Sequence, residues 1–214
     1  GSEAINSNTV LAEILQKACD ASGVPGSAVQ LIKTTDRLAV MEMLKLDGQI
    51  DLIVPRGGPE LIRTVVDNTR IPVIKHDKGL CHIYVEEDAD WAMARKVVLN
   101  AKAQRPGVCN AVETLLVHSN AASHFLPQVA SDFKAAGVEI RGCPVTREYI
   151  PHAEAATDED WDAEYLDLII SIKVVKDMEE AIEHIERYSS GLSEAIITNS
   201  YSKSMEFLRR IDSA

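Results

Sequence analysis

The sequence lacks the features that mark membrane, secreted and nucleic-acid-binding proteins. None of its apolar runs approaches the ~20 residues of a membrane-spanning helix, and no signal-peptide pattern opens it. Basic residues number 22 against 33 acidic ones, which gives a formal net charge of -11. A chain of that charge repels nucleic-acid phosphates and anionic membranes, so we expect neither as a partner.

Cysteine is also scarce, and no two cysteines form a CxxC pair. The four are Cys19, Cys81, Cys109 and Cys143. A disulfide framework is not expected in a chain of this size, and no ligand spacing supports a zinc cluster, so we predict no metal site. His82 follows Cys81 on a predicted strand, where neighbouring side chains point to opposite faces. These patterns favour a reducing, cytoplasmic location.

The residues that are present alternate between helix-like and strand-like patterns. The chain has 214 residues, 46% of them hydrophobic, which is enough for one large core or two modest ones. Short loops between helices and apolar strands predict right-handed crossovers and an open, parallel α/β layer. An acidic stretch at 158–167 is predicted to be a solvated connection. The expected helices are 8–21, 36–46, 59–69, 88–104, 123–137, 178–190 and 200–212. The expected strands are 28–32, 51–55, 81–85, 113–118, 166–175 and 193–198, with a further strand and its loop over 71–79.

One cysteine stands in an unusual local setting. The stretch AKAQRPGVCNAVETLLV places Cys109 in a Pro-Gly turn between a predicted helix and an apolar strand. A small buried hydrophobe is the common role of a cytosolic cysteine. A nearby cation, here Arg105, and backbone N–H groups around Asn110 would instead favour the nucleophilic thiolate. From the residues alone, both interpretations stay open.

A glycine-rich turn is the second candidate. Arg56, Gly57 and Gly58 follow the run DLIVP and lead into a helix that begins with proline. Such a turn can bring backbone N–H groups and a helix N-terminus against a phosphate. It carries neither the full GxGxxG fingerprint nor a Walker lysine, so a plain tight turn is the alternative.

These segments carry a family likeness. AKAQRPGVCNAVETLLV closely resembles the nucleophile segment of the glutamate-5-semialdehyde dehydrogenases (γ-glutamyl phosphate reductases), a branch of the aldehyde dehydrogenase superfamily. DLIVPRGGPELI, IPVIKHDKGLCHIYVEEDAD and LDLIISIKVVKDMEEAIEHI are similar to other segments of that family, in the same order. The resemblance implies part of a Rossmann-like NADP-binding domain over residues 1–80. An α/β catalytic domain, incomplete at its C-terminus, would follow over 81–214. It further implies an internal portion of a longer protein, inactive by itself.

The resemblance also implies roles for individual residues. Cys109 matches the nucleophile that attacks L-glutamyl 5-phosphate and forms a thioester, which NADPH then reduces to L-glutamate 5-semialdehyde. The backbone N–H of Cys109 would be one oxyanion donor. Asn110 is expected to contact the oxyanion or the substrate. The family pattern does not fix a role for Arg105, which we expect to hold the phosphate or a carboxylate of the substrate.

The cofactor residues follow from the same resemblance. Arg56, Gly57 and Gly58 match the turn expected against the pyrophosphate, and Ser2 and Glu3 match the loop expected near the adenosine ribose. The family further implies a homo-oligomer and functional coupling to glutamate 5-kinase.

One departure bears on the reaction. Hydrolytic aldehyde dehydrogenases carry a glutamate ahead of GGK, whereas this chain has KHDKG, with His76 or Asp77 near that place. Reduction is therefore favoured over hydrolysis. The alternatives are another acyl-phosphate or acyl-CoA reductase of the superfamily, or a non-catalytic binding or assembly module.

Overall fold

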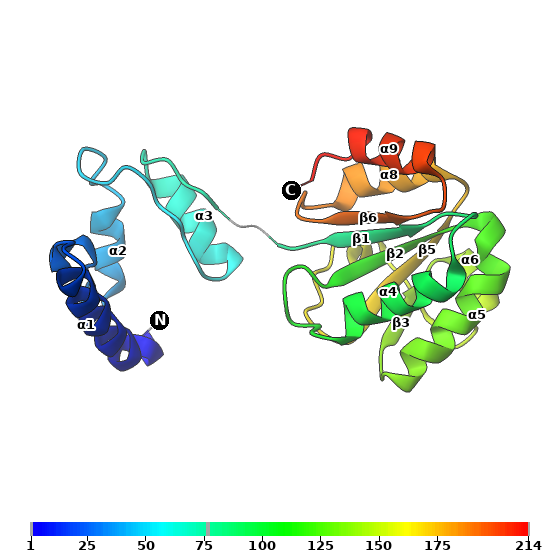
Figure 1. Ribbon diagram of the computed structural model, residues 1–214, viewed down its shortest axis with the longest axis horizontal. Helices are drawn as coiled ribbons and strands as arrows, with labels where there is room; N and C mark the ends of the chain where they lie inside the picture. The colour runs from blue at the N-terminus through cyan, green and yellow to red at the C-terminus, as the bar shows by residue number, and fades with distance from the viewer. Residues whose placement is uncertain (1, 76–77, 214) are drawn as a thin grey trace. The chain divides into compact units, whose positions relative to one another are not determined.

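The protein folds as two units joined in sequence. The computed structural model describes residues 2–75 and 78–213. Unit 1 comprises Gly1–His76 and unit 2 comprises Asp77–Ala214 (Figure 1).

Unit 1 consists mainly of helices. Its elements are η1 (Ser2–Ala4), α1 (Ile5–Ala21), η2 (Gly26–Ala28), α2 (Arg37–Met43) and α3 (Pro59–Asn68). The Asp36 side chain accepts a hydrogen bond from the Leu38 N–H (2.9 Å), so it caps α2 as its position in the sequence predicts. Helix α3 begins at a proline, whose fixed φ suits the first helical position.

The strands predicted for unit 1 are mostly missing. Ile53 and Val73 form an isolated parallel bridge, with Ile53 N–H donating to the Pro72 carbonyl (2.9 Å). The strand predicted at 28–32 is wrong, because Ala28 ends a 3-10 helix and the described residues provide no ladder partner for residues 29–32. An apolar run alone does not make a strand, since a ladder needs a neighbouring backbone to pair with.

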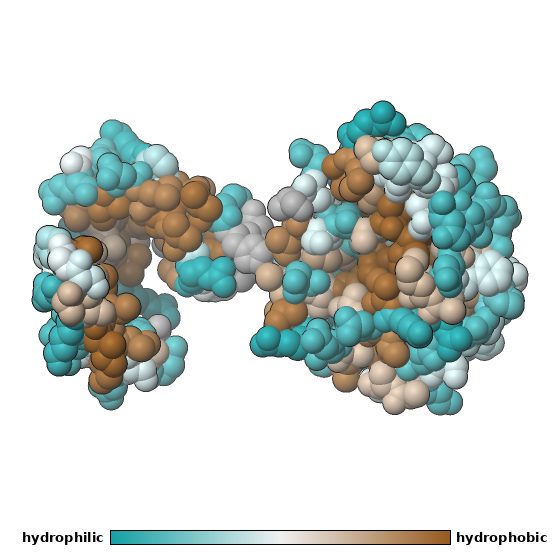
Figure 2. Space-filling view, in the orientation of Figure 1, coloured by the Kyte–Doolittle hydropathy of each residue, from teal (hydrophilic) through white to brown (hydrophobic). Residues whose placement is uncertain are grey.

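Unit 1 also leaves much apolar surface uncovered. Helix α1 contains no buried residue, and Val10, Leu11, Ile14 and Leu15 are each about half exposed. Figure 2 shows the corresponding brown surface on this unit. The helical periodicity therefore predicts the secondary structure correctly, but the described residues do not cover the apolar face that it implies.

Unit 2 is a parallel sheet covered on both faces. Its strands are β1 (Cys81–Val85), β2 (Val112–His118), β3 (Glu139–Gly142), β4 (Glu154–Ala155), β5 (Ile169–Val175) and β6 (Glu194–Ile197). Its helices are α4 (Trp91–Ala103), α5 (Ser119–Ala135), α6 (Pro144–Tyr149), α7 (Asp158–Trp161), α8 (Met178–Tyr188) and α9 (Tyr201–Arg210). The strand order is β4-β3-β5-β2-β1-β6, and every pairing is parallel. Helices α4 and α5 cover one face and α8 and α9 the other (Figure 1), which confirms the α/β layering predicted for this region.

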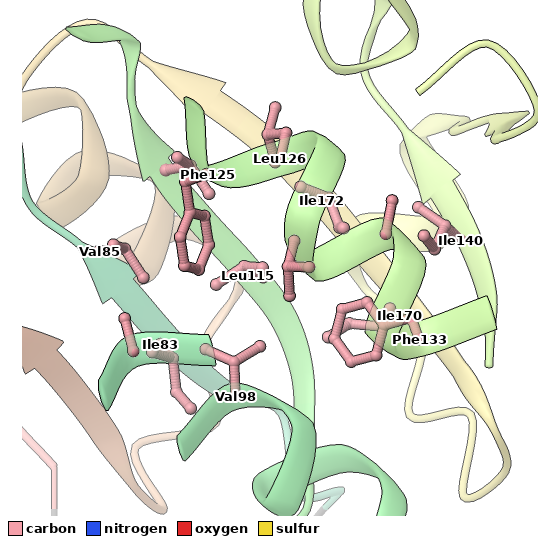
Figure 3. Packing of buried hydrophobic residues seen from close by; sticks show 14 of the residues in the cluster. Ile83, Val85, Val98, Leu115, Phe125, Leu126, Phe133, Ile140, Ile170 and Ile172 are labelled. Atoms are coloured by element: carbon pink, nitrogen blue, oxygen red, sulfur yellow. The ribbon is translucent and has the colours of Figure 1, made fainter. Parts of the chain in front are cut away.

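The main core lies between the sheet and α5. Phe125 and Phe133 of α5 pack against Leu115, Ile170 and Ile172 of the central strands, and all five are fully buried (Figure 3). All seven residues of β2 are buried, as expected for a central parallel strand.

Two parts of unit 2 differ from the sequence prediction. The region that forms β3, α6 and β4 had no predicted element, because each piece is too short to show a period. The stretch 158–167 is not simply solvated, since Asp160 and Trp161 are buried. Asp160 is stabilised there by the Tyr165 hydroxyl, which donates to its carboxylate at 2.8 Å, and by Arg141 at 3.3 Å.

Helix α5 begins one turn earlier than the predicted start at residue 123. His118, the last residue of β2, acts as its cap because its Nδ1 accepts the N–H of Asn120 (3.1 Å). Pro127 lies inside the helix, as the sequence prediction required. Among the described residues, no helix has the length and apolar character needed to cross a membrane.

His184 makes the stability of unit 2 depend on pH. Burial, followed by the nearby His82, lowers the pKa of His184 from 6.5 to about 3. Between these values the unfolded chain binds a proton that the folded chain does not. The free energy of unfolding should therefore fall as the pH drops below about 6.5, by at most ~1.4 kcal/mol per pH unit from this group.

Urea denaturation of the wild type and of His184→Phe at pH 7, 6 and 5 measures this contribution. The variant should lose less stability on acidification than the wild type does. Parallel pH dependence in the two proteins would contradict the assignment to His184.

Candidate active site

Cys109 lies in the loop between α4 and β2, at the edge of the sheet where β2 begins. Its side chain is exposed, whereas Cys81 and Cys143 are buried and Cys19 is partly buried. The interpretation of Cys109 as a small buried hydrophobe is therefore wrong. The thiol is accessible from solvent.

The backbone around this thiol has free hydrogen-bond donors. The turn is closed by two hydrogen bonds, from Val108 N–H to the Arg105 carbonyl (3.4 Å) and from Ala111 N–H to the Val108 carbonyl (3.0 Å). Between them, the N–H groups of Cys109 and Asn110 donate to no acceptor in the part of the chain that the structure describes. Adjacent free N–H groups beside a nucleophile are the donor set that an oxyanion needs.

The carbonyl of Cys109 is held by residues just before and at the start of β1. The Cys81 thiol donates to it at 3.5 Å, and a Cβ placed on Gly79 would lie only 2.2 Å from the same oxygen. Position 79 therefore requires glycine. Burial, followed by the charge of Glu194, raises the pKa of the Cys81 thiol to about 12, so at neutral pH this thiol keeps the proton that it donates.

A buried ion pair joins the two ends of the Cys109 loop. Lys102 Nζ, in the last turn of α4, lies 2.7 Å from Glu113 Oε2 at the start of β2, and both side chains are at most 1% exposed. Burial lowers the pKa of Lys102 and raises that of Glu113, while the hydrogen bond between them opposes both shifts. Removing one partner of such a pair typically costs about 3–5 kcal/mol, because it leaves a buried charge uncompensated.

Arg105 and Asn110 flank the thiol on the same loop. Both are exposed, and neither side chain is engaged in a hydrogen bond or ion pair with a described residue. They are thus free to contact a ligand. Their roles toward oxyanion and substrate stay predictions.

The residues predicted to hold a cofactor lie in unit 1. A hollow of about 730 Å³ is bordered by Glu3, by Gly58 and by both apolar and polar side chains of the neighbouring segments, Arg37 and Glu60 among them. Gly58 precedes α3, no side chain caps this helix, and a Cβ at Gly58 would meet no atom within 4 Å. Arg56 and Gly57 are exposed just before it, and Ser2 lies in η1. An uncapped helix N-terminus with open space beside it fits a phosphate group.

His76 and Asp77, which stand near the position of the hydrolytic glutamate in the resemblance, lie outside the described residues.

A second polar cluster lies at the opposite edge of the sheet. Glu86, Glu87 and His118 bring potential metal-ligand atoms within 4.8 Å of one another, a grouping that spacing in the sequence did not reveal. Lys203 Nζ lies 3.2 Å from Glu86 Oε1, so the buried carboxylate already has a cationic partner.

Four residues around the candidate nucleophile were not predicted from the sequence: Gly79, Cys81, Lys102 and Glu113. A weak signal was present for the last two, since a lysine and a glutamate interrupt apolar patterns on either side of the turn. Their contact depends on how the helix crosses the strand, which periodicity does not specify.

Three comparisons with known proteins find relatives of the same family. The model of the family described as "Aldehyde dehydrogenase family" matches residues 2–142. The γ-glutamyl phosphate reductase of Thermoanaerobacter pseudethanolicus is 53% identical over 214 residues, which are 100% of this chain and 52% of that protein. The chain thus spans about half the length of the curated relatives that it matches.

Solved structures agree in fold. The crystal structure of γ-glutamyl phosphate reductase from Thermotoga maritima superposes with a TM-score of 0.94 at 48% identity, over 100% of this chain and 51% of that one. Glyceraldehyde-3-phosphate dehydrogenase from Methanocaldococcus jannaschii, complexed with NADP, shares the fold with a TM-score of 0.75 at 18% identity, over 100% of this chain and 55% of its own. The family model matches about two thirds of this chain, and the chain therefore belongs to the aldehyde dehydrogenase family.

Proposed function

We propose that this protein reduces L-glutamyl 5-phosphate to L-glutamate 5-semialdehyde and phosphate with NADPH, through a thioester on Cys109. The observation that carries the proposal is the exposed Cys109 thiol in a turn with two free N–H groups. Relatives named γ-glutamyl phosphate reductase, which match the chain over its whole length, support this choice of substrate.

The first step is acyl transfer to sulfur. The Cys109 thiolate attacks the acyl carbon, the C–S bond forms, and the bond to the phosphate oxygen breaks as phosphate leaves with the electron pair. The N–H groups of Cys109 and Asn110 donate to the carbonyl oxygen while it carries negative charge. Phosphate is a good leaving group, so acylation needs no strong acid beside the thiol.

The second step releases the aldehyde. A nicotinamide cofactor held by unit 1 would supply the hydride for reduction of the thioester carbon. The C–S bond then breaks as the aldehyde carbonyl re-forms, and the Cys109 sulfur regains its negative charge. The same two N–H groups serve both steps, because the oxyanion occupies the same place in each.

Unit 1 would hold the cofactor. Gly58 and the N-terminus of α3 suit the pyrophosphate, Arg56 adds a positive charge beside Gly57, and Ser2 and Glu3 would contact the adenosine ribose. Membership of the aldehyde dehydrogenase family and a structural neighbour complexed with NADP support a nicotinamide cofactor. The preference for NADPH is part of the proposal.

The proposal also assigns a substrate contact and expected partners. Arg105 would bind the phosphate or a carboxylate of the substrate, since it is an exposed cation four residues before the thiol. An acyl phosphate is readily hydrolysed, so a kinase that phosphorylates glutamate is the expected supplier. Assembly into a homo-oligomer and a cytoplasmic location stay predictions.

Replacing the nucleophile tests the covalent step. With L-glutamyl 5-phosphate present and cofactor omitted, mass spectrometry of the complete gene product should find a glutamyl adduct on the peptide that contains Cys109. Cys109→Ser should remove the adduct and lower reductase turnover by at least about 10³-fold, because a serine hydroxyl is not ionised at neutral pH.

Cys143→Ser is the matched control, since this buried thiol lies in the same unit and should be silent. An adduct that persists in Cys109→Ser, or turnover that survives it, would favour a binding or assembly role instead.

The cofactor assignment predicts that the substitution Gly58→Asp stabilises helix α3 but weakens NADPH binding. Gly58→Asp places a carboxylate at the N-cap of α3, where the extended backbone and open space accommodate it. The helix should be stabilised by up to ~1 kcal/mol, whereas the NADPH Kd should rise at least about tenfold through repulsion of the pyrophosphate.

Fluorescence titration and thermal melting of the complete gene product measure the two effects. Gly48→Asp adds the same charge at another open glycine of unit 1 and should leave the NADPH Kd unchanged. Equal effects of the two substitutions would remove Gly58 from the cofactor site.

A further inference from the structure

The loop that carries Cys109 is tied together at its two ends. Lys102 precedes the thiol on α4 and Glu113 follows it on β2, and their side chains meet at 2.7 Å with almost no exposure to solvent. One buried contact therefore bridges the two ends of the intervening turn. Besides this contact, the turn is held by two backbone hydrogen bonds and by the Cys81 thiol, which donates to the Cys109 carbonyl.

Glu113 also fixes a second loop. Its other carboxylate oxygen, Oε1, accepts the N–H of Leu166 at 3.3 Å. Leu166 has a φ of 53°, in the left-handed region that a leucine seldom occupies. A backbone in that conformation persists only where its surroundings hold it, and the bond to Glu113 provides such a hold.

The second loop in turn contacts the first. A Cβ on Gly107, two residues before the thiol, would lie 3.6 Å from the Leu166 carbonyl oxygen, an ordinary packing distance. The Leu166 peptide thus borders the Cys109 turn with its carbonyl and is anchored to Glu113 through its N–H. Helix α4, strand β2 and the segment before β5 are joined at this point.

We propose that the buried Lys102–Glu113 pair positions Cys109 for acyl transfer, by fixing both ends of its turn and the Leu166 peptide beside it. The proposal rests on the proposed function. The pair itself touches no substrate, so Lys102 and Glu113 are positioning residues. Their effect would be on the orientation of the sulfur and of the two N–H donors, since a displacement of about 1 Å can slow such a reaction about 10²-fold.

The test uses variants that separate the charge pair from its hydrogen bond to Leu166. Lys102→Met combined with Glu113→Leu replaces the pair by apolar groups of similar size, which avoids an unpaired buried charge. Lys102→Met combined with Glu113→Gln also removes the pair but keeps a carbonyl oxygen for the Leu166 N–H. Arg95→Gln is the matched control, because it breaks an ion pair of the same helix with Asp132, at a distance from the turn in sequence.

Two readouts are measured on the complete gene product. Amide hydrogen exchange of residues 104–111 reports the turn directly, and steady-state kinetics separates kcat from KM. In the Met/Leu variant we expect exchange in 104–111 at least about tenfold faster, with β2 still protected. We expect kcat to be at least about tenfold lower, with KM within about threefold of wild type.

The Met/Gln variant should recover part of both losses, because the Leu166 bond is kept. Arg95→Gln should match the wild type in both readouts. A Met/Leu variant that is folded, protected over 104–111 and unchanged in kcat would overturn the proposal. So would a loss of kcat that Arg95→Gln reproduces.

Two further outcomes distinguish failure of the positioning proposal from failure of the proposed function. If the Met/Leu variant does not fold, the Met/Gln variant, which also leaves no buried charge unpaired, is compared directly with the wild type: faster exchange in 104–111 and a lower kcat are expected, and wild-type values of both would overturn the proposal. If the wild type lacks reductase turnover, the proposed function fails. The exchange of 104–111 in the variants then still shows whether the pair holds the turn.

Discussion

The structure of unit 2 depends on the complete burial of a central parallel strand. All seven residues of β2 are buried, so its backbone must be paired on both sides and its side chains covered on both faces. The helices on the two faces meet this requirement. It also imposes a cost, because Glu113 belongs to the strand and its carboxylate cannot reach water.

Lys102 resolves that conflict at the place where the chain needs a fixed loop. A buried carboxylate without a partner would be strongly destabilising, and the lysine of the preceding helix neutralises it within hydrogen-bond distance. The same contact closes the loop that presents Cys109. Stability of the strand and position of the candidate nucleophile are therefore properties of one interaction.

The location of the thiol departs from the usual rule for open α/β sheets, in which ligands bind outside the carboxyl ends of the strands. Cys109 lies where β2 begins, together with Gly79 before β1 and Leu166 before β5. The carboxyl ends instead carry Glu86 and its partner Lys203. Fold class alone directs attention to the carboxyl ends of the strands, whereas the local sequence around the cysteine directs it to the loop before β2, without deciding whether the thiol there is buried or exposed.

By itself, the sequence determined the helices with clear periods, the strands β1, β2, β5 and β6, and the presence of an unusual cysteine turn, because these depend on residues near one another in the chain. It overstated the strands of unit 1, where a ladder requires a second backbone that composition cannot provide. Only the tertiary structure decided that Cys109 is exposed while Cys81 is buried beneath its carbonyl, that position 79 admits nothing larger than glycine, and that Lys102 meets Glu113. These facts arise from close contacts between segments that pack together only in the folded chain, and a contact of that kind leaves no local pattern from which it could be predicted.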